Sequence, residues 1–305
     1  MNSSFVTEVQ ASDLSSKSNR LSRADWMALT KARLSLLVVI TTLIGFMAAS
    51  RSLGAFPWMV MLHTVIGSAL AAAAAAVFNQ LMEIDVDAQM ARTAGRPLPA
   101  RKMSREAAFG IGWLLGALGI VHLGVTVNAA AAFLAGATLA VYVFIYTPMK
   151  RTTGWNTIVG AVAGALPPLI GWFGGGGVWG IEALFLFGVL FFWQLPHFFA
   201  INWMYREQYE EAGFAMWANR DVSGARMASL SVATSAVLGL WFLLPPIFGF
   251  GATWAAAIGV VLGGYMLFRA VQWRKKLDRS AARGLFFSTL IYLPLALGVV
   301  VAGWI

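Results

Sequence analysis

Long apolar stretches recur along almost the whole 305-residue chain and constrain its fold more than any other feature. A helix that crosses a bilayer needs about 20 mostly apolar residues. Nine stretches approach this length: residues 34–50, 57–82, 108–125, 128–147, 156–174, 182–204, 228–248, 253–271 and 284–305. The fifth contains Gly160, Gly164, Pro167 and Pro168, which membrane helices tolerate when neighbouring groups satisfy the freed backbone. The sequence therefore predicts an all-α, polytopic membrane protein with about nine transmembrane helices.

The composition agrees with a membrane environment. Hydrophobic residues make up 59% of the chain and charged residues only 11%, whereas soluble domains carry about 25% charged residues. The formal net charge of +9 fits cytoplasmic loops in contact with membrane lipid better than a nucleic-acid partner, and we expect no nucleic acid. Cysteine is absent, which excludes disulfides and thiolate chemistry.

The distribution of charge predicts the orientation. On the nine-span interpretation, every Lys and Arg except Arg51 falls on the side of the amino terminus, and so does every Asp and Glu except Glu182. Basic residues concentrate on the cytoplasmic side. We therefore expect a multi-pass protein of the cell (inner, cytoplasmic) membrane with its amino terminus inside and its carboxyl terminus outside. Residues 1–25 are polar and predict a flexible cytoplasmic tail, which leaves 26–305 as one transmembrane domain.

The second span ends in a polar group, the first acidic stretch, formed by Asn79, Glu83 and Asp87. If the helix continues, these residues share one face, with about 6 Å of rise between neighbours. Carboxylates this near hydrocarbon are costly without a cation. The cation could be a Lys or Arg, which would make the group a structural ion pair, or it could be Mg²⁺, which prefers oxygen ligands.

The sixth span ends in a second acidic stretch, residues 206–211, in which Glu207 and Glu211 stand four residues apart on one face. Two acidic pairs that face each other could hold Mg²⁺ and a diphosphate between them. Basic residues suited to phosphate lie on the same predicted side: Arg92, Arg96, Lys150 and Arg151. Interfacial anchoring is the alternative explanation for these four residues.

The sixth span also carries His197, two or three turns before its acidic end. An isolated membrane histidine is usually a hydrogen-bonded packing residue, but a heme substrate would make a ligand of it, since neutral imidazole binds iron. We interpret His63 and His122 as structural.

The spacing Asn79-x3-Glu83-x3-Asp87, followed by Met90-Ala-Arg92-Thr93-x2-Arg96-Pro97, resembles the first signature of the UbiA superfamily of intramembrane prenyltransferases. Its details resemble the protoheme IX farnesyltransferase (heme O synthase) branch. Residues 29–46, 146–172 and 193–216 resemble the first span, the central signature and the second acidic region of that branch.

The resemblance implies nine helices around a central cavity and Mg²⁺-dependent transfer of a farnesyl group from farnesyl diphosphate to a vinyl group of protoheme IX. It implies catalytic roles for Asn79, Glu83, Asp87 and Glu207, and substrate-binding roles for Arg92, Arg96, Lys150, Arg151, His197 and Tyr209. The expected metal ligands are Asn79, Glu83, Asp87, Glu207 and Glu211. Partner proteins that handle heme, or an oxidase, are compatible with this function and are not specified by the sequence.

Three positions depart from the pattern of the branch. Ala32 replaces a proline, Glu83 replaces an aspartate, and Gln208 replaces an aspartate in the second stretch. Glu207, Glu210 or Glu211 could supply the missing charge.

One alternative function is that of a related prenyltransferase that acts on an aromatic acid or quinone precursor. Another is a transporter, which would place ionisable residues deep in several spans.

Overall fold

The structure is a computed structural model that describes residues 21–52 and 55–305. Within these ranges nine helical spans are long and apolar enough to cross a membrane, which confirms the predicted number. They are α3 (Ala32–Ala49), α4 (Trp58–Met82), α6 (Arg105–Thr126), α7 to α8 (Ala129–Met149), α9 to α10 (Asn156–Gly174), α11 (Ile181–Met204), α13 to α14 (Ala225–Ile247), α15 (Thr253–Lys276) and α16 (Arg279–Gly303). The predicted ends differ from these by five residues at most.

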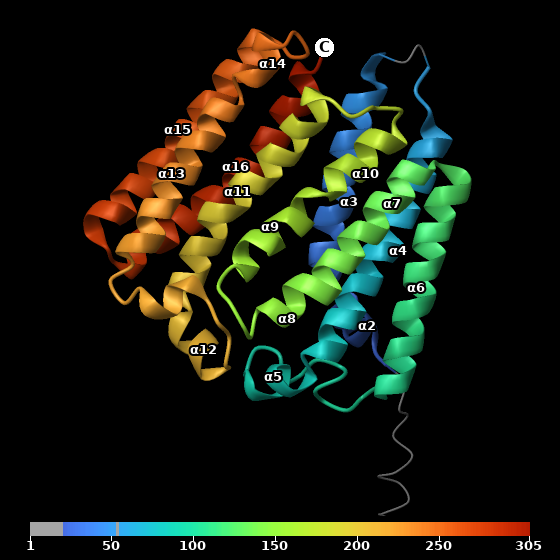
Figure 1. Cartoon of the computed structure of the whole chain (residues 1–305), viewed down its shortest axis with the longest axis vertical. Helices are drawn as coiled ribbons and strands as arrows, with labels where there is room; N and C mark the ends of the chain where they lie inside the picture. Colours follow the sequence, from blue (N-terminus) through green and yellow to red (C-terminus); the bar gives the residue numbers. More distant parts are fainter. Residues whose placement is uncertain (1–20, 53–54) are drawn as a thin grey trace, which may run out of the picture.

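The spans form one bundle with a charged end (Figure 1). Helices α13, α15, α16 and α11 form one side, α3, α4, α6 and α7 form the other, and α9 and α10 lie between them. The short helices α2 (Arg23–Leu29), α5 (Ile84–Gln89) and α12 (Arg206–Glu211) lie together at one end, whereas α14 (Leu244–Ile247) and the carboxyl terminus lie at the other. Two single turns, η1 (Ser50–Ser52) and η3 (Trp217–Arg220), complete the described elements.

Two of the spans are irregular. The fourth consists of α7 (Ala129–Ala140), a π-helical turn η2 (Val141–Tyr146) and α8 (Thr147–Met149), and the Thr147 amide donates to the Tyr142 carbonyl five residues back. The fifth divides at Leu166 into α9 (Asn156–Ala165) and α10 (Pro167–Gly174). Pro167 has no N–H to donate to the preceding turn, which favours a break at this position. Both spans lie beside the cavity described below.

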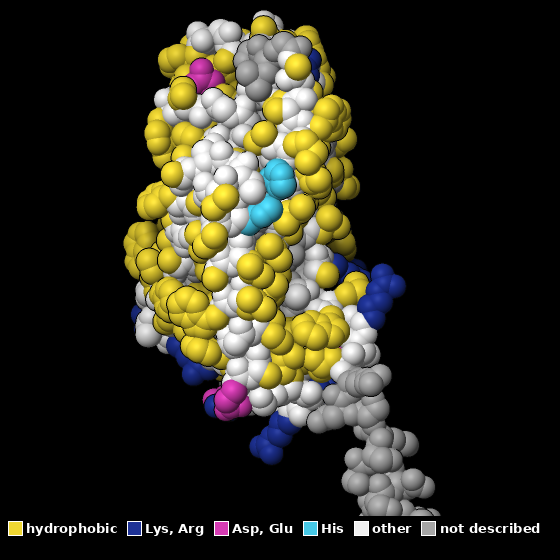
Figure 2. All heavy atoms as spheres, turned by 90° about the vertical axis from the view of Figure 1, so that its right-hand side faces the viewer, with side chains coloured by type: hydrophobic (Ala, Val, Ile, Leu, Met, Phe, Trp, Pro, Cys, Tyr) yellow, Lys and Arg dark blue, Asp and Glu magenta, His cyan; other side chains and the backbone are white. Residues whose placement is uncertain are grey.

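The outer surface of the bundle is apolar over most of its height. Figure 2 shows hydrophobic side chains over one face, with Lys, Arg, Asp and Glu gathered mainly near one end. His63 and His122 lie within this surface, where His63 Nδ1 and His122 Nε2 are 3.2 Å apart and join α4 to α6. The contact supports the structural role predicted for both histidines.

Helix α2 is held at its first residues by a side-chain cap and an ion pair. Ser22 caps α2 and exchanges hydrogen bonds with Asp25, and Lys102 Nζ lies 2.7 Å from Asp25 Oδ1. The hydrogen bonds from Lys102 and Ser22 lower the pKa of Asp25 to about 2. These contacts involve residues 22–25 of the predicted cytoplasmic tail, whose residues 1–20 lie outside the described part of the chain.

Candidate active site

A cavity opens between the two sides of the bundle. Its volume is about 280 Å³, close to the lower end of the range of roughly 300–1,000 Å³ that is usual for small-molecule sites. Its walls come from α3, α4, α7, η2, α9, α10 and α11 and are mainly apolar. Lys31 and Tyr146 line the part nearest the charged end of the bundle. The predicted central cavity is therefore present.

The first acidic stretch lies next to this cavity, at a break in the helix. Helix α4 ends at Met82, Glu83 occupies a turn, and α5 starts at Ile84. The Glu83 amide nevertheless donates to the Asn79 carbonyl at 3.1 Å, and the Asp87 amide to the Glu83 carbonyl at 2.7 Å. These hydrogen bonds keep the four-residue register through the break. Glu83 and Asp87 are only 6% and 4% exposed, and Asn79 is buried.

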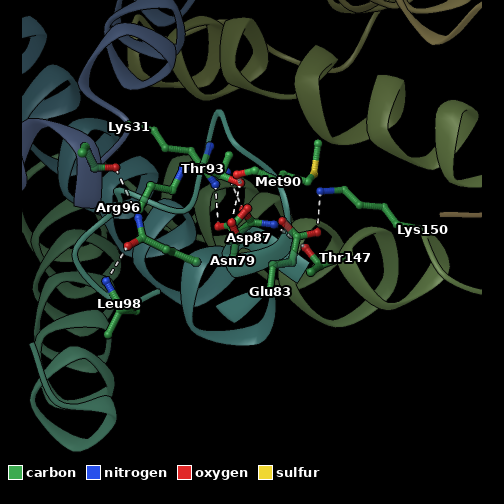
Figure 3. Close-up of polar contacts among 12 residues, drawn as sticks. Lys31, Asn79, Glu83, Asp87, Met90, Thr93, Arg96, Leu98, Thr147 and Lys150 are labelled. Atoms are coloured by element: carbon green, nitrogen blue, oxygen red, sulfur yellow. Dashed lines mark hydrogen bonds and ion pairs between the residues drawn. The ribbon is translucent and has the colours of Figure 1, made fainter. Parts of the chain in front are cut away.

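Each member of the first acidic stretch has a basic partner (Figure 3). Lys150 Nζ lies 2.8 Å from Glu83 Oε1, and Arg96 Nη1 lies 2.6 Å from Asp87 Oδ2. Lys31 Nζ donates to Asn79 Oδ1, and the Asn79 amide group donates to Thr147 Oγ1 at 3.2 Å. Buried carboxylates need such compensation, because an unpaired buried charge is strongly destabilising. The ion-pair alternative from the sequence is thus realised in this structure, with oxygen atoms of the kind that Mg²⁺ prefers.

Lys150 connects the first acidic stretch to the second. Its Nζ lies 4.7 Å from the centroid of the Tyr146 ring and 6.0 Å from that of Phe214, which packs against Tyr209. The Ala215 amide donates to the Lys150 carbonyl at 2.7 Å. Burial opposes the charge on Lys150, but Tyr146 and Glu83 outweigh it and raise the pKa of the lysine. Lys150 is therefore a fixed positive charge at the cavity.

The second acidic stretch is placed differently. Glu207 is exposed and pairs with its neighbour Arg206 at 2.9 Å, and Glu211 is exposed at the end of α12. Burial raises the pKa of Tyr209, and the charges of Arg92 and Lys150 oppose this rise. The Tyr209 ring lies 6.0 Å from that of Phe214, the ring that also lies near Lys150. In residues 21–52 and 55–305, no three His, Asp or Glu side chains form a cluster that could hold a metal ion. The structure thus brings Tyr209 toward the first stretch but leaves Glu207 and Glu211 at the surface.

The exposed basic residues Arg92 and Arg151 follow α5 and α8 in the chain, and these two helices lie toward the same end of the bundle. No ion pair of either residue is found in the described ranges. Arg96, by contrast, is part of the buried group through Asp87.

His197 does not line the cavity but lies where α11 meets α16. Its Nδ1 is 2.8 Å from Thr289 Oγ1, and the Thr289 hydroxyl donates to the Phe286 carbonyl at 2.6 Å. The imidazole must therefore donate through Nδ1, which leaves a lone pair on Nε2. The ring stacks between Trp193, at 5.5 Å, and Phe286, at 4.8 Å. Trp193 itself lines the cavity, so a single ring separates His197 from it.

Sequence reasoning missed two members of the site, Lys31 and Thr147. Lys31 precedes α3 in the left-handed conformation, at φ 47° and ψ 50°, which is uncommon for a residue other than glycine. Ala32 is the first residue of α3, a position that accepts proline, so the departure noted there alters only how the span begins. In the sequence, Lys31 is one of several basic residues at the membrane border. The fold brings it into contact with Asn79, which lies 48 residues further along the chain.

Comparisons with known proteins agree with this geometry. Residues 38–292 match the UbiA prenyltransferase family. A protoheme IX farnesyltransferase from Opitutus terrae is 42% identical over 281 residues, which cover 91% of this chain and 94% of that protein. Among solved structures, a digeranylgeranylglyceryl phosphate synthase has a TM-score of 0.78 at 15% identity, with coverage of 92% of this chain and 97% of that one. A UbiA homologue from Archaeoglobus fulgidus bound to GPP and Mg²⁺ has a TM-score of 0.61 at 14% identity, with coverage of 90% and 99%. The two structures share the fold of this chain. The chain is therefore a multi-pass integral membrane protein that belongs to the UbiA prenyltransferase family, in the branch of the protoheme IX farnesyltransferases.

Proposed function

We propose that this protein transfers the farnesyl group of farnesyl diphosphate to a vinyl group of protoheme IX and releases diphosphate. The observation that carries the proposal is the buried group of Asn79, Glu83 and Asp87 beside an apolar cavity, with Lys31, Arg96 and Lys150 as partners. The relative from Opitutus terrae supports the choice of acceptor. A transporter has no support from the family match.

The donor set of the first acidic stretch fits Mg²⁺. This ion binds one or two carboxylates and shares its other positions with water and substrate phosphates. Glu83, Asp87 and Asn79 would hold it, and Glu207 and Glu211 are the candidate ligands from the second stretch. The homologue from A. fulgidus carries Mg²⁺ together with a prenyl diphosphate. When bound, the ion would neutralise charge on the diphosphate oxygens.

The basic side chains would stabilise the leaving group. As the bond between farnesyl C1 and the diphosphate oxygen breaks, negative charge develops where Lys31, Arg96 and Lys150 converge. Arg92 and Arg151, exposed at the same end, would contact the outer diphosphate oxygens, and the Tyr209 hydroxyl would donate a hydrogen bond there. Arg forms planar paired hydrogen bonds with phosphate and Lys acts as a point charge.

The cavity would protect and direct the allylic cation. Its apolar walls exclude bulk water, and the rings of Tyr142, Tyr146 and Phe198 line it. Aromatic faces attract cations. The terminal carbon of the porphyrin vinyl group attacks farnesyl C1, which forms a carbon–carbon bond and moves the positive charge to the inner vinyl carbon. Water adds to that carbon and loses a proton, which gives a hydroxyethylfarnesyl side chain and diphosphate.

His197 is the candidate residue for positioning protoheme. Its neutral ring, fixed by Thr289, has the free Nε2 that iron ligation requires. Trp193 separates it from the cavity, so a porphyrin bound there would lie at the α11–α16 side with an edge toward the farnesyl group.

For the orientation, we propose that the charged end is cytoplasmic, because almost all basic residues lie there. The chain has no cysteine, so single cysteines at Lys102 and at Ile305 can be labelled with an impermeant thiol reagent in intact cells. Labelling of the Lys102 variant and not of the Ile305 variant would reverse the orientation.

The activity is tested with the purified full-length protein in nanodiscs, supplied with protoheme, farnesyl diphosphate and Mg²⁺. Chromatography should resolve a heme whose mass has gained a farnesyl group and one hydroxyl group. Chelation of Mg²⁺ should stop its formation. A parallel reaction with an aromatic acid acceptor tests the alternative, and prenylation of that acid with unmodified heme would overturn the proposal.

A further inference from the structure

The cavity has a closed end. Its lining residues Thr41 and Ile170 are followed on α3 and α10 by a region where the two backbones touch. A Cβ at Gly45 would overlap the Pro168 carbonyl oxygen, and a Cβ at Gly171 would overlap that of Thr42. Only glycine permits this approach, which leaves no passage between the two helices beyond this point.

The length of the cavity can be measured along its helices. Ser68, Ala72 and Ala76 line it from one face of α4, the face that continues to Asn79. Ser68 and Asn79 are eleven residues apart, or about 16 Å along a helix. On α3, the ten residues from Lys31 to Thr41 span about 15 Å. Both helices therefore give the same depth, from the proposed diphosphate site to the closed end.

This depth matches a chain of three isoprene units. At ordinary carbon–carbon bond lengths, an extended farnesyl chain is about 14 Å long, a geranyl chain about 9 Å and a geranylgeranyl chain about 19 Å. The farnesyl chain fills the cavity to its end. The geranyl chain leaves one isoprene unit of space empty, and the geranylgeranyl chain is too long to lie extended within the cavity.

Ser68 is the polar group at that end. It is 1% exposed, and its hydroxyl has no hydrogen-bond partner in the described part of the chain. The neighbouring lining residues Thr41 and Thr138 donate to carbonyls of their own helices. An unpaired buried hydroxyl is unfavourable, and Ser68 differs in this from Thr41 and Thr138.

We propose that Ser68 sets the prenyl chain length of this enzyme by forming the end wall of the prenyl site, and that Ala72, about one turn nearer Asn79, lies beside the second isoprene unit. The inference rests on the prenyl diphosphate half of the proposed function and is independent of the acceptor.

Binding of uncleavable thiolo analogues of geranyl, farnesyl and geranylgeranyl diphosphate, with Mg²⁺ and without any acceptor, tests the proposal on the full-length protein. The wild-type protein should bind the farnesyl analogue about tenfold more tightly than the geranylgeranyl analogue. Ser68→Leu should weaken binding of the farnesyl analogue about tenfold and leave binding of the geranyl analogue unchanged. Ala72→Leu should weaken binding of both the farnesyl and the geranyl analogue.

Ser235→Leu is the matched control, because Ser235 is also a buried, unpartnered serine in a span, α13, that does not line the cavity. It should leave the order of the three analogues unchanged, and thermal unfolding would show whether either leucine disturbs the fold. An equal loss for all three analogues in Ser68→Leu, or an unchanged farnesyl affinity, would overturn the proposal. If none of the analogues binds to the wild-type protein, the proposed function itself fails, and binding without any length preference refutes only the role of Ser68.

Discussion

The two acidic stretches have the same four-residue spacing and very different surroundings. The Glu83 and Asp87 side chains are 9% and 6% exposed and pair with basic residues from other segments of the chain, whereas the Glu207 side chain is 76% exposed and pairs with the adjacent Arg206. A charge in a buried group acts at low effective dielectric, and a charge in water is screened. The comparison teaches that spacing identifies a candidate site, while the partners decide how strongly its charges act.

The sharpest way to break this comparison is to neutralise one buried carboxylate. Asp87→Asn keeps the shape of the side chain but leaves Arg96 without its partner and removes a proposed metal ligand. We expect heme product formation to fall by about 10²–10³-fold, as when a group that stabilises developing charge is lost. The measurement is the rate at saturating substrates and Mg²⁺, with thermal unfolding as a control for folding. A variant that keeps a tenth of the rate would remove Asp87 from the site.

Lys150 tests the basic side of the same group. Lys150→Met should reduce the rate by about 10²-fold, because Glu83 is left buried and unpaired and the leaving group loses a charge. Lys150→Arg keeps the charge and should recover part of the activity.

The pH dependence of the wild-type rate adds a second measurement on Lys150. Because its pKa is raised in the folded protein, the stabilisation from its charge is complete below the unfolded value of about 10.4 and is lost only as the pH rises through the folded value. Lys150 should therefore cause no loss of rate between pH 7 and 9. A decline in that range that is present in the wild type and absent in Lys150→Arg would contradict the assignment.

Substitutions in the second acidic stretch should reduce the rate less than Asp87→Asn does. Glu207→Gln and Glu211→Gln each remove an exposed charge, and we expect the rate to fall by less than about tenfold, with a moderate rise in the Mg²⁺ concentration needed. The Mg²⁺ dependence of the rate provides the measurement. If either change costs as much as Asp87→Asn, the exposed stretch closes onto the first one during the reaction and the contrast between them disappears.

The smallest change in rate is expected when the ion pair of Asp25 and Lys102 is removed. The pair lies at the same end of the bundle but outside the cavity lining, and exposed pairs contribute little. Asp25→Asn should change the rate by less than about twofold at neutral pH. A tenfold loss would show that electrostatic effects at this end reach beyond direct contacts.

The spans could be predicted from the sequence because each one carries its own signal. Twenty apolar residues are sufficient to predict a membrane helix whatever packs against it, and Pro167 marks the break in the fifth span. The first acidic stretch was also visible, since hydrogen bonds across Glu83 preserve the helical register.

The rest depends on contacts between distant segments. Nothing local indicates that Lys31 reaches Asn79, that His197 faces α16 and not the cavity, or that Glu207 stays exposed while Glu83 is buried. The π-helical turn at Val141–Tyr146 also has no signature in its residues, because Val, Tyr, Phe and Ile favour no such turn.

That turn has a consequence for how the site is assembled. A π-turn holds one residue more than the equivalent α-helical turn, so it changes the angular phase between the two parts of the fourth span by about 100°. Thr138 and Leu139 line the cavity before it, and Lys150, anchored by Ala215, meets Glu83 after it. The proposed prenyl wall and the proposed leaving-group site are therefore in phase because of this extra residue. Deleting one residue from 141–146 would keep the span but rotate Lys150 relative to Thr138 and Leu139.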